Sequence, residues 1–336
     1  MFFFYSDFPR PPLIYLGEQP VQDGGKNIDR GLLIILGLIL AAEFVNGWTD
    51  APNAITTVVA TKALKPKAAV ALAVLGNMVG AFYGRAVAKT IGTEIVRPEA
   101  VNLVTLSASM VAVVIWSTAA ARAGVPTSEG HALIAGLAGA GLATAGPGVL
   151  LLTGWKKVFL GLVISSCFGA AGGWATAWVL RVLFGDLTPQ ASRRVFNTLQ
   201  VIAAGGMAIS HGSNDGQKFI GLFTLALLLT GVIPSFTVHP WVIILCSVVM
   251  GVGTSTGGWR IIEKVGTQMV KIEPDQGFAA QTAAAASILF ASHLGIPLST
   301  THTINTALMG AGAVKGLKAV NWGVVRELVL AWLLTF

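Results

Sequence analysis

Two long apolar stretches of this sequence each contain one aspartate where the helix is expected to be interrupted. The first, residues 31–61, carries Asp50, and the second, residues 195–230, carries Asp215. A carboxylate at membrane depth is costly and by default marks a substrate or ion path. Two such carboxylates in repeated, broken helices indicate a secondary transporter, because transporters bind substrates at discontinuous helices.

The composition supports a membrane protein. Hydrophobic residues make up 54% of the 336 residues and charged residues only 11%, whereas soluble domains carry about 25% charged residues. Leu103–Ala121 and Val158–Phe184 are long enough to cross a hydrocarbon core that needs about 20 residues. We therefore predict an all-α polytopic protein that crosses the cell membrane several times.

Several other classes of protein are disfavoured. The net charge of +7 comes from basic residues that lie singly or in pairs between apolar segments, which is typical of cytoplasmic loops rather than of nucleic-acid binding. Cys167 and Cys246 both lie inside apolar segments, which argues against a disulfide or a metal cluster. The sequence has no nucleotide-binding loop, metal-ligand cluster or nucleophile elbow, so we expect neither an enzyme nor a cofactor.

The apolar segments form two similar sets of five. Residues 31–184 make the first repeat and residues 195–336 the second, after a polar leader at 1–30. An odd number of crossings turns the second copy upside down, so we predict an inverted-topology tandem repeat. The chain ends within an apolar run, which suggests that the last helix is clipped. The ten segments lie at about 31–61, 66–84, 100–121, 128–145, 155–184, 195–230, 241–257, 279–294, 299–316 and 320–336.

A second motif also occurs once in each repeat. Gly124–His131 aligns with Gly295–His302, and each has the pattern Pro-x-Ser-x-x-His. These elements are either the tips of re-entrant hairpins or ordinary loops between full spans. We favour tips, because small polar residues would have little use at a surface that is already hydrated. The basic residues near 62–67, 193–194 and 260–271 place those loops in the cytoplasm.

The aspartates need positive partners, since a bare buried charge costs several kcal/mol. Lys218 lies one helical turn after Asp215 and can supply one partner. Asn53 is placed in the same way after Asp50, where its amide oxygen suits a small hard cation. The alternative is that either aspartate belongs to a structural ion pair. The predicted cation-coupling residues are Asp50, Asn53, Asn214, Asp215, Lys218 and Glu129, with Asp50, Asn53 and Asp215 as the ligands if the ion is sodium.

The two Pro-x-Ser tips offer the opposite chemistry. Each serine can begin a helix, whose free backbone N–H groups, together with nearby hydroxyls, form an oxyanion site. A plain helix cap is the simpler interpretation of such a turn. The predicted phosphate-binding residues are Ser128, Gly130, His131, Ser299, Thr300, Thr301, His302 and Gln217.

Several roles stay open at this point. His131 and His302 either contact the substrate or pack against a helix start, and His211 either orients the Asp215 segment or acts as a ligand. Glu129 is a proton carrier, a partner for Arg122 or a first-turn residue that suits the helix dipole.

At these residues the chain resembles the inorganic phosphate transporter (Pit) family. Its hallmark is a repeated Gly-Ala-Asn-Asp-x-Ala-Asn-Ala-like segment, to which Thr49–Ala54 and Ser213–Lys218 are similar. Its paired Pro-x-Ser-x-Thr-His tips resemble Pro126–His131 and Pro297–His302. The resemblance covers about residues 31–336. It implies an inverted-repeat helical fold and uptake of phosphate, or of a metal–phosphate complex, with sodium or protons.

Three departures from the family pattern bear on the coupling ion. Thr49 replaces the usual Asn before Asp50, Lys218 stands where an Asn is expected, and Glu129-Gly130 replace two threonines of the first tip. They favour one cation or a proton over a symmetric two-sodium mechanism.

We therefore expect a phosphate symporter whose partners are phosphate, H⁺ or Na⁺ and the lipid bilayer, with a homodimer as one arrangement considered. The alternatives are a permease for another tetrahedral oxyanion such as sulfate, and a passive channel or structural membrane component.

Overall fold

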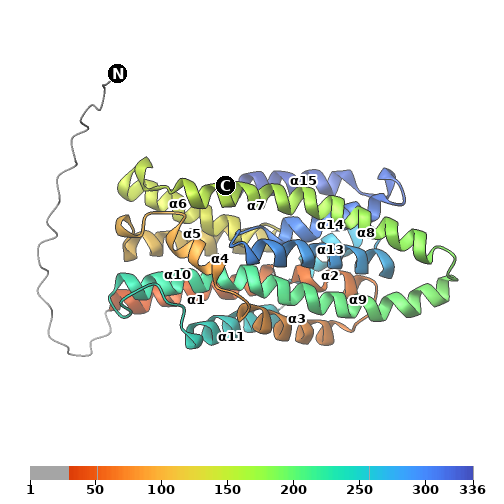
Figure 1. The fold of residues 1–336 in the computed structure, drawn as a ribbon, viewed down its shortest axis with the longest axis horizontal. Coiled ribbons are helices and arrows are strands. Elements are labelled where there is room, and N and C mark those ends of the chain that lie inside the picture. The colour runs from red at the N-terminus through yellow and green to blue at the C-terminus, as the bar shows by residue number, and fades with distance from the viewer. Residues whose placement is uncertain (1–29, 51, 257, 336) are drawn as a thin grey trace, which may run out of the picture.

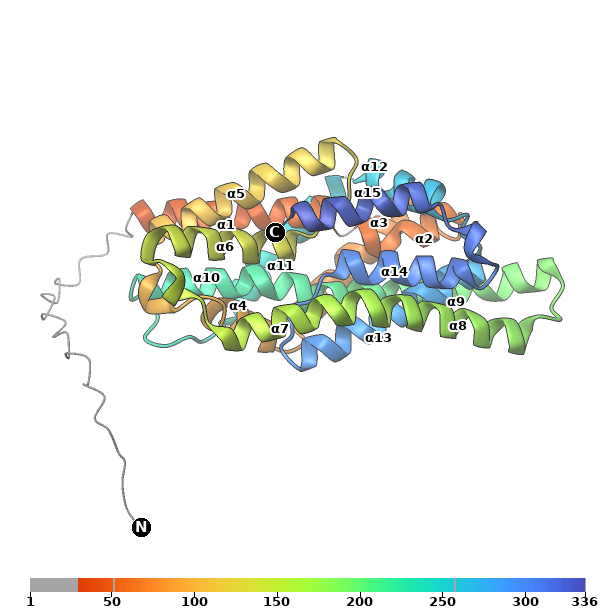
Figure 2. The ribbon, with the colours of Figure 1, turned by 90° about the horizontal axis from the view of Figure 1, so that it is seen from above.

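The computed structural model describes residues 30–50, 52–256 and 258–335, which fold into helices apart from two isolated β-bridges. The predicted polar leader lies outside these residues, except for Arg30 at the start of α1. The long helices lie roughly along one axis of an elongated bundle (Figures 1 and 2). The first half of the chain contains α1 (Arg30–Thr49), α2 (Pro52–Ala60), α3 (Pro66–Ala81), α4 (Ala86–Thr93), η1 (Pro98–Ala100), α5 (Leu103–Arg122), α6 (Glu129–Ala145), η2 (Pro147–Val149), α7 (Leu152–Val163), η3 (Ile164–Phe168) and α8 (Gly169–Phe184).

The second half follows a similar order. One bent pair of helices occurs in each half, with a bend of 73° between α3 and α4 and of 65° at the corresponding end of α11. The sequence did not predict the short helices after these bends. The elements are α9 (Pro189–His211), η4 (Gly212–Gly216), α10 (Gln217–Leu229), α11 (Pro240–Thr256), α12 (Trp259–Glu263), η5 (Lys264–Met269), α13 (Pro274–His293), α14 (Thr300–Ala313), η6 (Leu317–Ala319) and α15 (Trp322–Leu334).

The two aspartate segments differ in backbone structure. In the first, α1 ends at Thr49 and α2 begins at Pro52, because a proline has no N–H to continue the helical ladder. In the second, α9 continues into α10 through the π-helical turn η4, which contains Asp215. The prediction of a break at Asp215 is therefore wrong. No proline interrupts that segment. A π-helical turn contains one residue more than an α-helical turn and does not end the helix.

Length and apolarity identify fewer candidate spans than the ten predicted segments. Within the described residues, three helical stretches are long and apolar enough to cross a membrane, or five if each bent pair counts as one span. Several other helices are too short alone, such as α14 with 14 residues and α15 with 13, against the roughly 20 that a span requires.

Each aspartate segment packs closely against a neighbouring helix at a glycine residue. A Cβ atom added at Gly212 of α9/η4 would lie 2.8 Å from the carbonyl carbon of Asn77 in α3. One added at Gly47 of α1 would lie 2.8 Å from the carbonyl carbon of Met250 in α11. The two contacts are equivalent in the two halves, and small residues of this kind let helix backbones approach closely.

Gly212→Ala is expected to destabilise the protein by about 1–3 kcal/mol, because the new methyl group would overlap the Asn77 backbone. Gly206→Ala on the same helix is the matched control, since a Cβ there has nothing within 4 Å. Thermal unfolding of the purified proteins in detergent measures both. Equal melting temperatures for the two variants would contradict this account of the contact.

Candidate functional site

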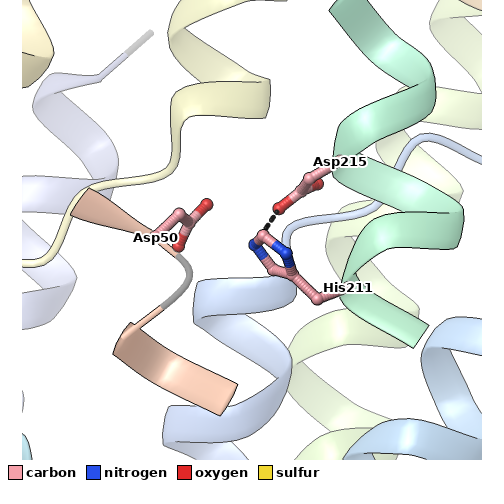
Figure 3. Close-up of side chains that lie close together, drawn as sticks. All are labelled: Asp50, His211 and Asp215. Atoms are coloured by element: carbon pink, nitrogen blue, oxygen red, sulfur yellow. Dashed lines mark ion pairs between the residues drawn. The ribbon is translucent and has the colours of Figure 1, made fainter. Parts of the chain in front are cut away.

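Five elements meet around the two aspartates. Asp50 lies between α1 and α2, Asp215 lies in η4, and the first residues of α6 and α14 approach them from the tips. Figure 3 shows Asp50 at the α1–α2 break, facing His211 and Asp215 on the opposite helix. One ligand atom from each of these three side chains lies within 4.8 Å of the others, a spacing that a bound cation could span. Each of the three is buried.

In the first half of the site, only some of the buried polar atoms have hydrogen-bond partners. Asp50 Oδ1 accepts hydrogen bonds from Asn53 Nδ2 at 2.6 Å and from the hydroxyl of Thr301. Asn53 Nδ2 also donates to Thr301 Oγ1 at 3.0 Å. Among the described residues, no donor reaches Asp50 Oδ2 or Asn53 Oδ1. Buried polar atoms are normally paired, so these two oxygens are candidate ligands for a cation.

In the second half, both carboxylate oxygens of Asp215 have partners within the protein. Lys218 Nζ forms an ion pair with Asp215 Oδ1 and donates to the carbonyl of Leu298 at 2.7 Å. Asp215 Oδ2 accepts from the hydroxyl of Thr300 and lies 3.3 Å from His211 Nε2. His211 Nδ1 in turn lies 3.1 Å from Asn77 Oδ1 on α3. This arrangement corresponds to the alternative in which His211 orients the Asp215 segment.

Glu129 brings a third carboxylate to the first half. It is the first residue of α6, is buried, and accepts a hydrogen bond from the hydroxyl of Thr49. Its carboxylate also lies near that of Asp50. The suggested pairing with Arg122 is wrong, because no ion pair joins the two among the described residues and Arg122 is exposed at the end of α5.

The two predicted caps are present. Ser128 Oγ accepts from the backbone N–H of His131 at 3.3 Å, and Ser299 Oγ accepts from that of His302 at 3.1 Å. The rings of His131 and His302 pack edge to face with centroids 4.8 Å apart, and His302 also packs on Trp332 at 4.0 Å. This geometry corresponds to the packing alternative for the two histidines.

Comparison with known proteins identifies the family. The family model described as the phosphate transporter family matches residues 46–336. This chain belongs to the phosphate transporter family. The resemblance seen in the sequence is thereby confirmed, and the chain is a multi-pass membrane transporter rather than an enzyme.

Curated relatives within the phosphate transporter family cover nearly the whole chain. A protein of Bacillus subtilis (strain 168), named a probable low-affinity inorganic phosphate transporter, is 37% identical over 306 residues, which are 90% of this chain and 92% of the relative. A Rhizobium meliloti (strain 1021) protein of the same name is 38% identical over 307 residues, with the same coverage.

A solved structure supports the fold. That of "The sodium-dependent phosphate transporter" has a TM-score of 0.83 at 23% identity and covers 91% of this chain and 95% of that chain. The fold is therefore an all-helical membrane architecture with broken helices and re-entrant-like pairs.

In this member of the phosphate transporter family the tip threonines face carboxylates. A threonine hydroxyl has a single hydrogen, and those of Thr300 and Thr301 are donated to Asp215 and Asp50. The N–H groups of His131 and His302 are bound by the capping serines, so the donors left at the two tips are the backbone N–H groups of the first two residues of α6 and α14, which have no partner within the helix. The predicted role of these hydroxyls in phosphate binding stays a prediction.

Two predicted site residues point to other partners. Asn214 Nδ2 donates to Ser292 Oγ at 2.9 Å and to the carbonyl of Ile296 at 3.2 Å. Gln217 Nε2 donates to the carbonyl of Tyr83 in the α3–α4 connection. In this conformation the two side chains anchor η4 and α10 to their neighbours.

The sequence analysis missed Glu43, which is fully buried in α1. Its Oε2 accepts from Asn46 Nδ2 at 3.1 Å, and no donor in the described part of the chain reaches Oε1. Glu43, Asn46 and Asp50 are spaced by three and four residues, so they follow one face of the helix. The argument applied to Asp50, an acidic residue within an apolar stretch, would have found Glu43.

Proposed function

We propose that this protein takes up inorganic phosphate together with a cation, H⁺ or Na⁺, by alternating access. The observation that carries the proposal is the balance of buried charge. Among the described residues, four carboxylates are buried, Glu43, Asp50, Glu129 and Asp215, against one buried ammonium, Lys218. Burying uncompensated charge costs several kcal/mol per ion. A phosphate anion enters such a site only if mobile cations accompany it.

The unsatisfied oxygens indicate where the mobile cation binds. Asp50 Oδ2, Asn53 Oδ1 and Glu129 Oε2 belong to the first half of the site and receive no donor from the described residues. Carboxylate and amide oxygens suit a small hard cation, and a pair of close carboxylates equally suits a shared proton. Both ions therefore fit this half. In the second half, Lys218 already neutralises Asp215.

The anion is assigned to the starts of α6 and α14. Both tips are buried beside the aspartates, and each presents backbone N–H groups at a serine-capped helix start. Such a start favours negative charge. The proposed phosphate-binding residues remain Ser128, Gly130, His131, Ser299, Thr300, Thr301, His302 and Gln217.

We also propose that residues 31–184 and 195–336 form inverted repeats and that the two tips belong to re-entrant hairpins. Equivalent packing supports the repeat: α1 contacts α11 and α5, as α9 contacts α3 and α13. The burial of Thr127–Glu129 and Leu298–Thr300 supports the hairpins, since irregular backbone at membrane depth needs to be covered by protein. The repeats would move relative to each other around the site.

Uptake of radiolabelled phosphate into proteoliposomes, with imposed sodium or pH gradients, tests the proposal. We expect accumulation driven by one of the two gradients and little inhibition by excess sulfate. Sulfate that competes equally would make the protein a general oxyanion permease. Phosphate that only equilibrates would make it a passive path, which the buried carboxylates disfavour because they repel anions.

Thr301→Val keeps the volume of the side chain and removes its hydroxyl. We expect the Thr301 hydroxyl to turn from Asp50 to the anion once phosphate is bound. A hydrogen bond to a charged group contributes about 1.5–3 kcal/mol, so the KM for phosphate should rise about ten- to a hundredfold at saturating cation. Thr267→Val is the control, since that exposed hydroxyl donates to the Glu263 carbonyl one turn earlier in the same helical stretch. A shift in the cation dependence alone would mean that the Thr301 hydroxyl serves Asp50 and not phosphate.

A further inference from the structure

The two halves of the site place different residues at equivalent positions. The third residue after each aspartate is Asn53 in the first half and Lys218 in the second. The second residue after each capping serine is Gly130 at the first tip and Thr301 at the second. Each tip contacts both aspartate segments. At these two positions the tips face the segment of the other half: Asn53 faces Thr301, whereas Lys218 faces Gly130.

Lys218 occupies the space that a side chain at position 130 would need. A Cβ atom added at Gly130 would overlap Lys218 Nζ and lie 3.0 Å from Cε and 3.1 Å from Cδ. At the equivalent place in the other half, the Thr301 hydroxyl lies 3.0 Å from Asn53 Nδ2. The first half therefore has the short polar pair Asn53–Thr301 at this place. The second half has the long, positively charged side chain of Lys218 facing a glycine.

The ammonium is held firmly at that position. Lys218 is 1% exposed and is bound by Asp215 and by the Leu298 carbonyl. Lys218 binds Asp215 Oδ1 and Thr300 donates to Oδ2, so both oxygens have a partner. Asp50 Oδ2 and Asn53 Oδ1 in the first half receive no donor in the described part of the chain. One half of the site is closed to a mobile cation and the other half is open.

We propose that Lys218 and Gly130 form a matched pair in which the missing side chain makes room for a permanent, built-in cation. The pair sets the number of mobile cations, because the ammonium fills the place where the other half offers oxygen ligands. This inference rests on the proposed cation-coupled function. It predicts that Gly130→Thr together with Lys218→Asn, which copies the Asn53–Thr301 pair, creates a second site for sodium.

Four proteins test the pair: the parent, Gly130→Thr, Lys218→Asn and the double variant. Gly139→Thr on the same helix is the steric control, since a Cβ there has nothing within 4 Å. The first measurement is thermal unfolding in detergent without phosphate, in sodium chloride or in equimolar N-methyl-D-glucamine chloride at fixed pH. The second is the rate of phosphate uptake into proteoliposomes as a function of sodium concentration.

Gly130→Thr is expected to lose more than about nine-tenths of phosphate uptake and to melt at a lower temperature, because of steric overlap, whereas Gly139→Thr behaves as the parent. Lys218→Asn leaves Asp215 without its cation and is expected to melt at a lower temperature in sodium-free buffer. The double variant should regain uptake and be stabilised by sodium by several degrees more than the parent, because bound ligand stabilises the folded state. The rate of phosphate uptake by the double variant should rise with the sodium concentration to a power that is one higher than for the parent.

Three results would overturn the inference: full activity of Gly130→Thr, a double variant no better than the worse single variant, or equal stabilisation of the parent and the double variant by sodium. The unfolding measurement needs no phosphate. A parent protein that fails to transport phosphate would therefore contradict the proposed function while leaving the test of the matched pair intact.

Discussion

Asp50→Asn is expected to abolish gradient-driven phosphate accumulation while leaving the protein folded. The substitution keeps the shape of a side chain that is 1% exposed and removes its charge. Thr301 and Asn53 provide the hydrogen bonds to Asp50 Oδ1, and an amide oxygen accepts them equally well. The lost feature is the negative charge that holds the mobile cation. A bond to a charged group contributes about 1.5–3 kcal/mol, so we expect the affinity for the coupling cation to fall about ten- to a hundredfold, and coupled accumulation to be lost with it.

Asp186→Asn is the matched control, because Asp186 is an exposed aspartate in the α8–α9 connection. It should accumulate phosphate as the parent does. Phosphate exchange in the absence of a gradient is a second measurement. If the mobile cation is a proton, Asp50→Asn should retain exchange, because the neutral asparagine side chain resembles protonated aspartate. Full accumulation by Asp50→Asn at neutral pH would remove the cation-site assignment from the first half.

Lys218→Met is expected to destabilise the folded protein by about 3–5 kcal/mol, the cost of leaving one member of a buried ion pair without its partner. Methionine keeps most of the length of the side chain and removes the ammonium that binds Asp215 and the Leu298 carbonyl. Melting temperature in detergent, at a pH where exposed carboxylates are ionised and without sodium, measures the effect.

The double variant Lys218→Met/Asp215→Asn separates charge from packing. It removes both charges of the pair, so most of the lost stability should return, as it does when both members of a buried pair are replaced. A double variant as unstable as Lys218→Met alone would mean that Lys218 matters for its contacts with Gly130 and Leu298 and not for its charge.

The sequence predicted the helical segments well, and the backbone details only where one residue determines them. Pro52 has no backbone N–H, so it could be predicted that α1 ends shortly before this residue. The Asp215 segment contains no such residue, so no local signal in the sequence predicts its π-turn, which packs closely against Asn77 of α3 at Gly212. The short helices α4 and α12 follow bends that tertiary contacts impose, so the periodicity of the sequence did not reveal them.

Contacts within one element of the site could be predicted, whereas contacts between the halves could not. The spacing of three residues places Lys218 beside Asp215 in any helical turn, and the structure contains that ion pair. The bond between Thr301 and Asp50 joins residues 251 positions apart. It exists because the second tip packs against both aspartate segments, and neither local sequence predicts that packing.

The cation-to-phosphate ratio, measured in proteoliposomes at fixed pH, tests the central claim most directly. Phosphate accumulation is followed while sodium and proton gradients are imposed separately, and its order in each cation is determined. A single open half, with Asp215 neutralised by Lys218, predicts accumulation above equilibrium that rises with the first power of one cation. Uptake that rises with the square of the sodium concentration, or that never exceeds equilibrium, would contradict it.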